Sequence, residues 1–274
     1  MNRTGTGVLG VAWALLVVTA MGVTAHYLRD VVNNAFFLRS TGVSQEARTN
    51  LQEVLDRQSR DLGSFADQMG QSPVLEETTF QEKAVRLLID APAFSAVAFL
   101  NDKFRREWVF PFAAGKDLRG TELKGPPDAL GAATRAQKTR QPAASGLVDL
   151  TQGGMGVQLY APVFQGSLWQ GLVEGPIQVG QLAMNFIGPA LGQGFHYSII
   201  DERQGREIFT TLSQEDRTKS PAYDAFFTLA VADRTWWVLL HPQTPPPTLA
   251  ILVGALSVEA FVGALVFFLW RRRR

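Results

Sequence analysis

Cysteine is absent from this 274-residue chain, which excludes both a disulfide framework and a metal site with cysteine ligands. Histidine is scarce: His26, His196 and His241 are the only three, and no pair has the spacing of metal ligands. The sequence also lacks the Gly-x-Ser-x-Gly motif of serine hydrolases and a phosphate-binding loop that ends in Gly-Lys-Ser or Gly-Lys-Thr. We therefore predict that the protein is not an enzyme and holds no metal or cofactor.

An excess of positive charge is missing as well. The chain has 26 basic and 25 acidic residues. Without Arg3, Glu259 and the four arginines at positions 271–274, 21 basic and 24 acidic residues remain, a net charge of −3. Such a balance provides no basic surface for phosphate groups, so we expect no nucleic-acid partner.

Two long apolar runs are the most informative feature that the chain does have. Residues 4–28 contain no charged side chain, and residues 248–270 contain only Glu259. Each run exceeds the roughly 20 residues that cross a bilayer, which predicts transmembrane helices within 1–28 and 243–270. Four arginines follow the second run, and the positive-inside rule makes them a cytoplasmic stub, 271–274. We expect a two-pass protein of the inner membrane with both termini cytoplasmic and residues 29–247 periplasmic or extracellular.

Two alternatives remain open at the ends of the chain. The first run is also compatible with a signal peptide cleaved after Val23-Thr24-Ala25, although it is longer than the apolar region of most signal peptides. No kinase, cyclase or methyl-accepting module follows the second run. A receiver for any transmitted signal would then belong to a longer receptor or to a partner protein.

A heptad pattern after the first run predicts a long stalk helix within 29–78. Its apolar positions are spaced 4, 3, 4, 3 and 4 residues apart, and Gly70 and Pro73 end the helix. This seam consists of Leu51, Leu55, Gln58, Leu62, Phe65 and Met69. It either packs on its own domain or pairs with a second chain, and the second interpretation predicts a homodimer.

The middle of the chain predicts an α+β fold with two lobes, 79–180 and 181–242, each built on an antiparallel sheet. A capping box at Thr79 and Glu82 starts a helix, and Asp128 caps another that runs through Gln137. A helical stretch at 180–191 separates the lobes. The remaining β-prone runs pair as hairpins or neighbouring strands. These runs are 94–100, 104–110, 144–150, 156–164, 169–179, 195–200, 207–212, 222–231 and 235–240.

Several strings in this region resemble the CHASE sensory domain. They are Asp128 to Ala136, Gly146 to Thr151, Gly156 to Phe164, Gly171 with Gly175, the helix from Phe186, Tyr197 to Asp201, and Arg234 to Trp237. In that family two PAS-like lobes stand on a stalk helix, and the membrane-distal lobe binds small ligands. Such domains are the inputs of histidine kinases and nucleotide cyclases, and of the plant cytokinin receptors.

Strand alternation predicts a pocket in the distal lobe. Gln158 and Tyr160 share one face of their strand, and Trp108 and Phe110 share a face of another. Aromatic walls with a few polar anchors are typical of small-molecule sites, although core packing is the ordinary role of such residues. The CHASE resemblance adds three candidates and matches Tyr160 to a ligand-contacting position. The three are Ser145 and Gly175, which lie near two further positions, and Glu122, near the family's acidic residue; cytokinin itself is not implied.

The functional expectation is therefore a membrane-anchored sensor. A small molecule binds the distal lobe, and the change passes across the membrane to a cytoplasmic transmitter of the histidine kinase or diguanylate cyclase type. The alternative is an accessory or structural membrane protein whose PAS-like ectodomain binds nothing. That alternative predicts a distal lobe without a cavity, with Gln158 and Tyr160 buried in packing.

Overall fold

A computed structural model describes residues 5–72, 74–111, 118–123, 127–150, 154–192, 194–218 and 225–242, together with 261 and 263. The chain divides into two compact units, one formed by Met1–Thr41 with Pro242–Arg274 and the other by Gly42–His241. In the part of the chain that the structure describes, no helix is both long and apolar enough to cross a bilayer. Most of the predicted second span lies outside the described residues, so the two-pass topology stays a prediction.

Helix α1 (Gly5–Gly70) is continuous, and its portion from Gly42 belongs to the second unit. Every residue of the heptad seam is buried there, including Gln58, which is 2% exposed. The seam therefore packs on its own domain, and the prediction of a homodimer loses the support that it took from this pattern. Gly70 ends the helix where only glycine fits, because a Cβ would lie 2.2 Å from the carbonyl oxygen of Phe164.

The first sheet is antiparallel and has six strands in the order β2-β1-β6-β5-β3, with β4 also paired to β5. Its centre is a hairpin of two eleven-residue strands, β5 and β6. The predicted strands at 94–110 and 144–179 are thus found, with small shifts at their ends. The six strands are β1 (Val97–Asn101), β2 (Arg106–Phe110), β3 (Ala143–Ala144), β4 (Val148–Asp149), β5 (Met155–Gln165) and β6 (Leu168–Gln178).

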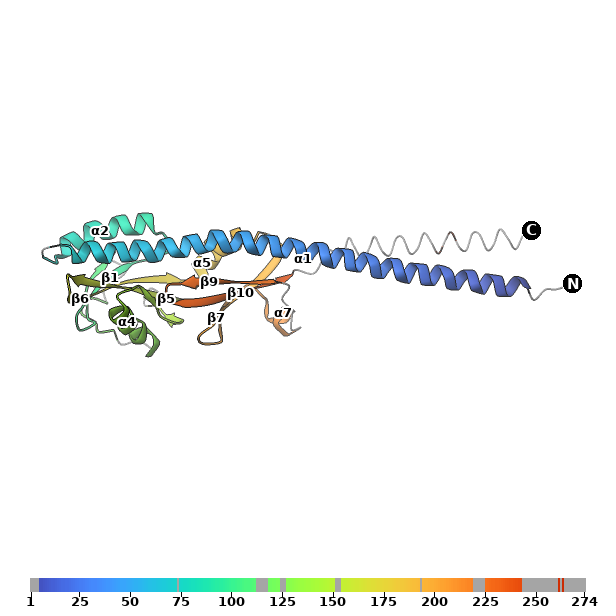
Figure 1. Ribbon diagram of the computed structural model, residues 1–274. Coiled ribbons are helices and arrows are strands. Elements are labelled where there is room, and N and C mark those ends of the chain that lie inside the picture. Colours follow the sequence, from blue (N-terminus) through green and yellow to red (C-terminus); the bar gives the residue numbers. More distant parts are fainter. Residues whose placement is uncertain are drawn as a thin grey trace. The chain divides into compact units, whose positions relative to one another are not determined.

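Helices cover both faces of this sheet (Figure 1). On one face, Phe80 of α2 (Glu77–Asp90) contacts Phe65 of α1 and Trp108 of β2, and Trp108 stacks on Phe99 with ring centroids 4.8 Å apart. On the other face, α4 (Pro127–Thr139) packs through three fully buried alanines, Ala132, Ala133 and Ala136. Alanine allows a close approach of helix to sheet, so the α4 side of the lobe has little room inside it.

The second sheet has four strands in the order β8-β7-β10-β9. They are β7 (Phe195–Asp201), β8 (Arg206–Thr210), β9 (Ala225–Val231) and β10 (Arg234–Pro242), close to the predicted runs. A short helical connection precedes them, made of α5 (Val179–Leu182), the π-helix η1 (Ala183–Ile187) and α6 (Gly188–Leu191). The expected α+β architecture with two antiparallel sheets is therefore confirmed.

A side chain of α1 completes the outer edge of this second sheet. The amide of Ala230 in β9 donates to Gln52 Oε1 at 2.8 Å, and Gln52 Nε2 donates to the Ala230 carbonyl at 3.1 Å. Gln52 thus makes the two bonds that a neighbouring strand would make. Unpaired edge strands invite aggregation, and this arrangement protects one of them while it fixes α1 on the sheet.

Two predicted helix caps are wrong. Helix α2 begins at Glu77, so Thr79 lies inside the first turn and cannot be the N-cap of a capping box. Helix α4 begins at Pro127, a residue that favours the first helical position, which places Asp128 inside the helix. The Asp128 carboxylate instead accepts hydrogen bonds from Arg234, far away in the sequence.

Gln58 provides a test of the buried seam. Its Oε1 atom is buried and has no hydrogen-bond donor among the residues that the structure describes. We predict that Gln58→Leu raises the free energy of unfolding by about 1 kcal/mol, because it removes the cost of a buried polar atom without a partner. Urea unfolding of the full chain in detergent measures this change.

Gln52→Leu is the matched control on the same helix. It removes both bonds to Ala230 and should lower the free energy of unfolding by about 1 kcal/mol. Destabilisation by Gln58→Leu would contradict the interpretation of the seam.

Candidate functional site

The face of the first sheet that α4 covers carries a small group of buried polar residues. Tyr160 of β5 pairs with Glu174 of β6, and alternation puts Gln158 on the same face as Tyr160. Arg106 of β2 joins them because its guanidinium reaches Glu174. A cavity of about 10 Å³ lies beside this group. Ten residues line it: Ala96, Val97, Ala98, Arg106, Val109, Leu118, Leu150, Gln158, Glu174 and Pro176.

Arg106 and Glu174 form a buried ion pair with two parallel hydrogen bonds. Arg106 Nε donates to Glu174 Oε2 at 2.7 Å and Nη2 donates to Oε1 at 2.9 Å, and the side chains are only 9% and 5% exposed. Burial opposes the charge of the guanidinium, but the neighbouring Glu174 carboxylate outweighs it and raises the pKa of Arg106. Each partner depends on the other, because an unpaired buried charge is costly.

Tyr160, Gln158 and Ser145 continue this polar group across β5. The Tyr160 hydroxyl donates to the side-chain oxygen Oε1 of Gln158 at 2.6 Å, and the backbone amide of Gln158 donates to Ser145 Oγ at 2.9 Å. Tyr160 is completely buried, and burial, reinforced by the negative charge of Glu174, raises its pKa well above 10. The phenol is therefore a neutral hydrogen-bond donor at physiological pH.

The structure brings together three of the seven predicted site residues, Ser145, Gln158 and Tyr160. Trp108 lies on the opposite face, against Phe80 of α2, and strand alternation puts Phe110 on that face with it. Gly175 faces the same way, because a Cβ there would lie 2.7 Å from the Phe94 ring. Glu122 is exposed and forms a β-bridge with Arg105. The expected pocket of Gln158 with the aromatic residues of β2 is not formed, because the sheet separates them.

Sequence reasoning missed Arg106 and Glu174, although both left a signal. Glu174 is a single acid within seven consecutive buried positions of β6, and Arg106 is a buried base at the start of β2. A charged residue is almost never buried without a partner. Two opposite charges on neighbouring apolar strands are therefore a pattern that predicts an ion pair.

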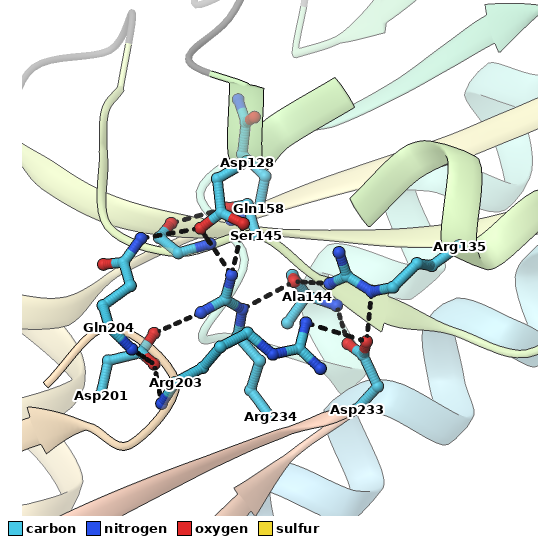
Figure 2. Close-up of polar contacts among 11 residues, drawn as sticks. Asp128, Arg135, Ala144, Ser145, Gln158, Asp201, Arg203, Gln204, Asp233 and Arg234 are labelled. Carbon is cyan, nitrogen blue, oxygen red and sulfur yellow. Dashed lines mark hydrogen bonds and ion pairs between the residues drawn. The ribbon is translucent and has the colours of Figure 1, made fainter. Parts of the chain in front are cut away.

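A second polar cluster joins the two sheets and is shown in Figure 2. At its centre is Arg234, the first residue of β10, whose side chain is completely buried. Its Nη1 donates to Asp201 at 2.6 Å, its Nη2 donates to both carboxylate oxygens of Asp128, and its Nε donates to the Ala144 carbonyl at 3.0 Å. We call this group, with the residues described next, the Arg234 cluster.

Asp233, next to Arg234, makes a parallel set of contacts. Its carboxylate accepts from Arg135 Nε at 2.6 Å and from the Ala144 amide at 2.7 Å. Burial favours the neutral acid, but the bonds to Arg135 and Ala144 outweigh it and lower the pKa of Asp233. The Ala144 peptide is thus bound on both sides, its N–H by Asp233 and its carbonyl by Arg234 and Arg135.

No family model matches the chain, and no curated protein matches it either. Solved structures do. An extracellular ligand-binding receptor from Desulfohalobium retbaense has a TM-score of 0.62 at 13% identity, over 74% of this chain and 40% of that one. The ligand-binding domain of the Pseudomonas aeruginosa amino acid chemoreceptor PctC, in complex with GABA, has a TM-score of 0.55 at 12% identity, over 77% of this chain and 99% of that one. The ligand-binding domain of the Pseudomonas fluorescens chemoreceptor CtaA, in complex with L-valine, has a TM-score of 0.55 at 10% identity, over 77% of this chain and 99% of that one.

This likeness shows the fold, because all three identities are low. The chain shares the fold of extracellular ligand-binding domains of chemoreceptors, and it spans 40% of the first of the three structures. The expected two-lobed α+β fold is confirmed at this level. The more specific assignment to the CHASE family stays a prediction.

The Arg106–Glu174 pair yields a prediction about stability. Arg106→Met leaves the Glu174 carboxylate buried without its partner and should lower the free energy of unfolding by roughly 3–5 kcal/mol. The double variant Arg106→Met/Glu174→Leu removes both charges and should recover most of that loss. Urea unfolding curves of the three proteins decide between them, and a double variant as unstable as Arg106→Met would contradict the assignment.

Tyr160 yields a prediction about alkaline pH. Its pKa is raised in the folded protein, so the unfolded chain loses this proton first as the pH rises above about 10. Stability is then complete below about pH 10 and falls above it, and Tyr160→Phe should flatten that fall. Tyr197→Phe is the comparison variant: burial raises the pKa of Tyr197 too, but less than that of Tyr160, so this variant should flatten the fall by a smaller amount. An equally steep fall in Tyr160→Phe would show that the phenol is not buried.

Proposed function

We propose that the domain formed by residues 42–241 is an extracytoplasmic ligand-sensing domain that binds a small molecule on the α4-covered face of its six-stranded sheet. The observation that carries this proposal is the buried polar group of Arg106, Glu174, Gln158 and Tyr160, which is set in an otherwise apolar wall. Apolar walls with a few convergent polar groups are typical of small-molecule sites. The fold shared with ligand-binding domains of chemoreceptors supports the same function.

The charges of the site indicate the chemistry of the ligand. Arg106 and Glu174 provide one cation and one anion, each of which must keep a partner while it is buried. A ligand that carries both a carboxylate and an amine can take the place of this ion pair. Its carboxylate pairs with Arg106 and its amine pairs with Glu174 when the two side chains separate. The two chemoreceptor domains above are in complex with GABA and with L-valine, which are molecules of this kind. We therefore propose an amino acid or a similar small zwitterion as the ligand.

Binding requires the site to open. A volume of about 10 Å³ is close to the smallest that holds one water molecule. The state described here is accordingly closed, and a ligand stabilises a second state in which the Arg106–Glu174 bonds are broken. The apparent affinity is reduced by the fraction of molecules that are open.

The membrane part of the proposal follows from the sequence. The predicted spans would hold the domain at the inner membrane, and β10, which ends at Pro242, leads toward the run at 248–270. A change in the domain would pass through this run to a cytoplasmic transmitter of the histidine kinase or diguanylate cyclase type, as the CHASE resemblance implies. Pairing of two chains remains part of this proposal, without the buried seam as its interface.

The size of the cavity favours a second candidate function. An accessory membrane protein with an ectodomain that binds nothing would have Gln158 and Tyr160 packed away, and both residues are buried here, Tyr160 completely. In that case the Arg106–Glu174 pair would only be structural. The two functions differ in whether the closed site can open to a ligand.

Thermal unfolding of the full chain in detergent tests the proposal. A panel of amino acids and GABA, with organic acids and purines beside them, is added at up to about a hundred times the expected Kd. A ligand of the folded state should raise the Tm by roughly 5–10 °C, since it adds about 2.7 kcal/mol of stability.

The charge-free variant Arg106→Met/Glu174→Leu is the control, and it should lose the shift caused by a zwitterion. If no compound in the panel shifts the Tm of the folded protein, the accessory function is favoured. A shift that survives in the control variant would place the binding site elsewhere.

A further inference from the structure

The Arg234 cluster is built around the buried side chains of Arg234 and Asp201, and the proposed ligand site does not use it. It contains three carboxylates, Asp128, Asp201 and Asp233, and three guanidinium groups, those of Arg135, Arg203 and Arg234. Its members come from both lobes: α4 and the segment after β3 on one side, the β7–β8 turn and the start of β10 on the other (Figure 2). The opposite charges are balanced, so the cluster needs no external ion.

In the first lobe, Arg234 and Asp233 contact only residues of the short segment 144–146 and of helix α4, among the described residues. The Ala144 carbonyl accepts a hydrogen bond from Arg234, and the Ala144 amide donates one to Asp233. Gly146 donates its amide to Asp128 Oδ2 at 2.7 Å, and Asp128 is bound by Arg234. The residue between these two anchored positions is Ser145.

Ser145 holds Gln158 in place. The Ser145 amide donates to the Gln158 carbonyl, and the Gln158 amide donates to Ser145 Oγ, both at 2.9 Å. The Gln158 side chain in turn accepts the hydrogen bond of Tyr160. Hydrogen bonds that are linked through the backbone of residues 144–145 and through Gln158 therefore connect Arg234 in the second lobe with the phenol that borders the ion pair of the first lobe.

The fit at Gly146 shows how little freedom this series has. A Cβ at Gly146 would lie 2.1 Å from Asp128 Oδ2 and 2.3 Å from Gln204 Nε2, which itself donates to Asp128 at 2.8 Å. Asp128 cannot withdraw without leaving Arg234, whose guanidinium has no contact with water to replace it. Any displacement of the 144–146 segment therefore has to move Arg234 as well.

We infer that Arg234 is a positioning residue for the ligand site of the first lobe: it acts through Asp128 and Ala144 to set Ser145, Gln158 and Tyr160. The inference rests on the proposed function only for the identity of the site. Its consequence is that the site and the β9–β10 turn of the second lobe move together. Binding that shifts Gln158 or Tyr160 biases the second lobe, and changes in that lobe alter binding equally, because coupling between two sites is reciprocal.

Fluorine NMR of the full chain labelled with 3-fluorotyrosine tests this inference without any ligand. The chain has four tyrosines, and Tyr160→Phe identifies the resonance of Tyr160. In Arg234→Gln we expect the Tyr160 resonance to move, although the substitution is in the other lobe. The matched control is Arg217→Gln, which breaks an exposed ion pair with Glu207 in the second lobe and should leave Tyr160 unchanged.

Tyr197 reports on the second lobe and separates positioning from a general loss of structure. A purely structural role for Arg234 would move Tyr197 and leave Tyr160 where it is, and that result would overturn the inference. Where Arg234→Gln does not fold, Gly146→Ala replaces it, since its methyl group would lie too close to the Asp128 carboxylate that binds Arg234. An unchanged Tyr160 in folded Gly146→Ala would overturn the inference equally.

The outcome is distinguishable from that of the ligand panel. A moved Tyr160 resonance with no ligand found would support the positioning role and count against ligand sensing. A ligand that binds Arg234→Gln as tightly as the parent chain would overturn the positioning role alone. If Arg234 positions the site, the Kd of the ligand for the Arg234→Gln variant should rise by about 5- to 150-fold, the range of typical coupling between sites.

Discussion

A buried guanidinium has to be paired, and this requirement at Arg234 determines how the two lobes fit together. One lobe provides Asp128 and the Ala144 carbonyl, and the other provides Asp201. Separating the lobes would leave Arg234 with Asp201 as its only partner and would remove its bonds to Asp128 and to the Ala144 carbonyl. Helix α1 contributes too, because its buried seam runs along the domain and its Gln52 completes the edge of the second sheet.

The Arg106–Glu174 pair is a buried charge of a different kind. Both of its members come from strands of one sheet, so it holds no two lobes together, and an apolar pair of similar volume would serve packing as well or better. A pair that stability does not require, set beside a cavity and a buried phenol, supports the proposed role in recognition. The Arg234 cluster binds Ala144 of β3, which pairs with β5, and β5 in turn pairs with β6, the strand that carries Glu174.

The sequence predicted elements well and side-chain partners poorly, for identifiable physical reasons. Strand alternation correctly put Gln158 and Tyr160 on one face, because that rule holds within a strand. It could not relate Trp108 to them, since the faces of two strands are matched only by their pairing register. Asp128 looked like a helix cap for a similar reason: an acid near a helix start favours the N-terminus whatever else it binds, and Arg234 is 106 residues away.

Closure of the site and its connection to the second lobe have one structural origin. The alanines of α4 bring that helix onto the sheet, and the same helix carries Asp128 in its first turn and Arg135 further along. Any opening that makes room for a ligand must therefore move α4, or the strands beneath it, relative to groups that Arg234 and Asp233 hold. A domain closed in this way cannot respond in one lobe alone. If the proposed ligand binds, the small cavity and the charged junction require the domain to have a second, open state that involves both lobes.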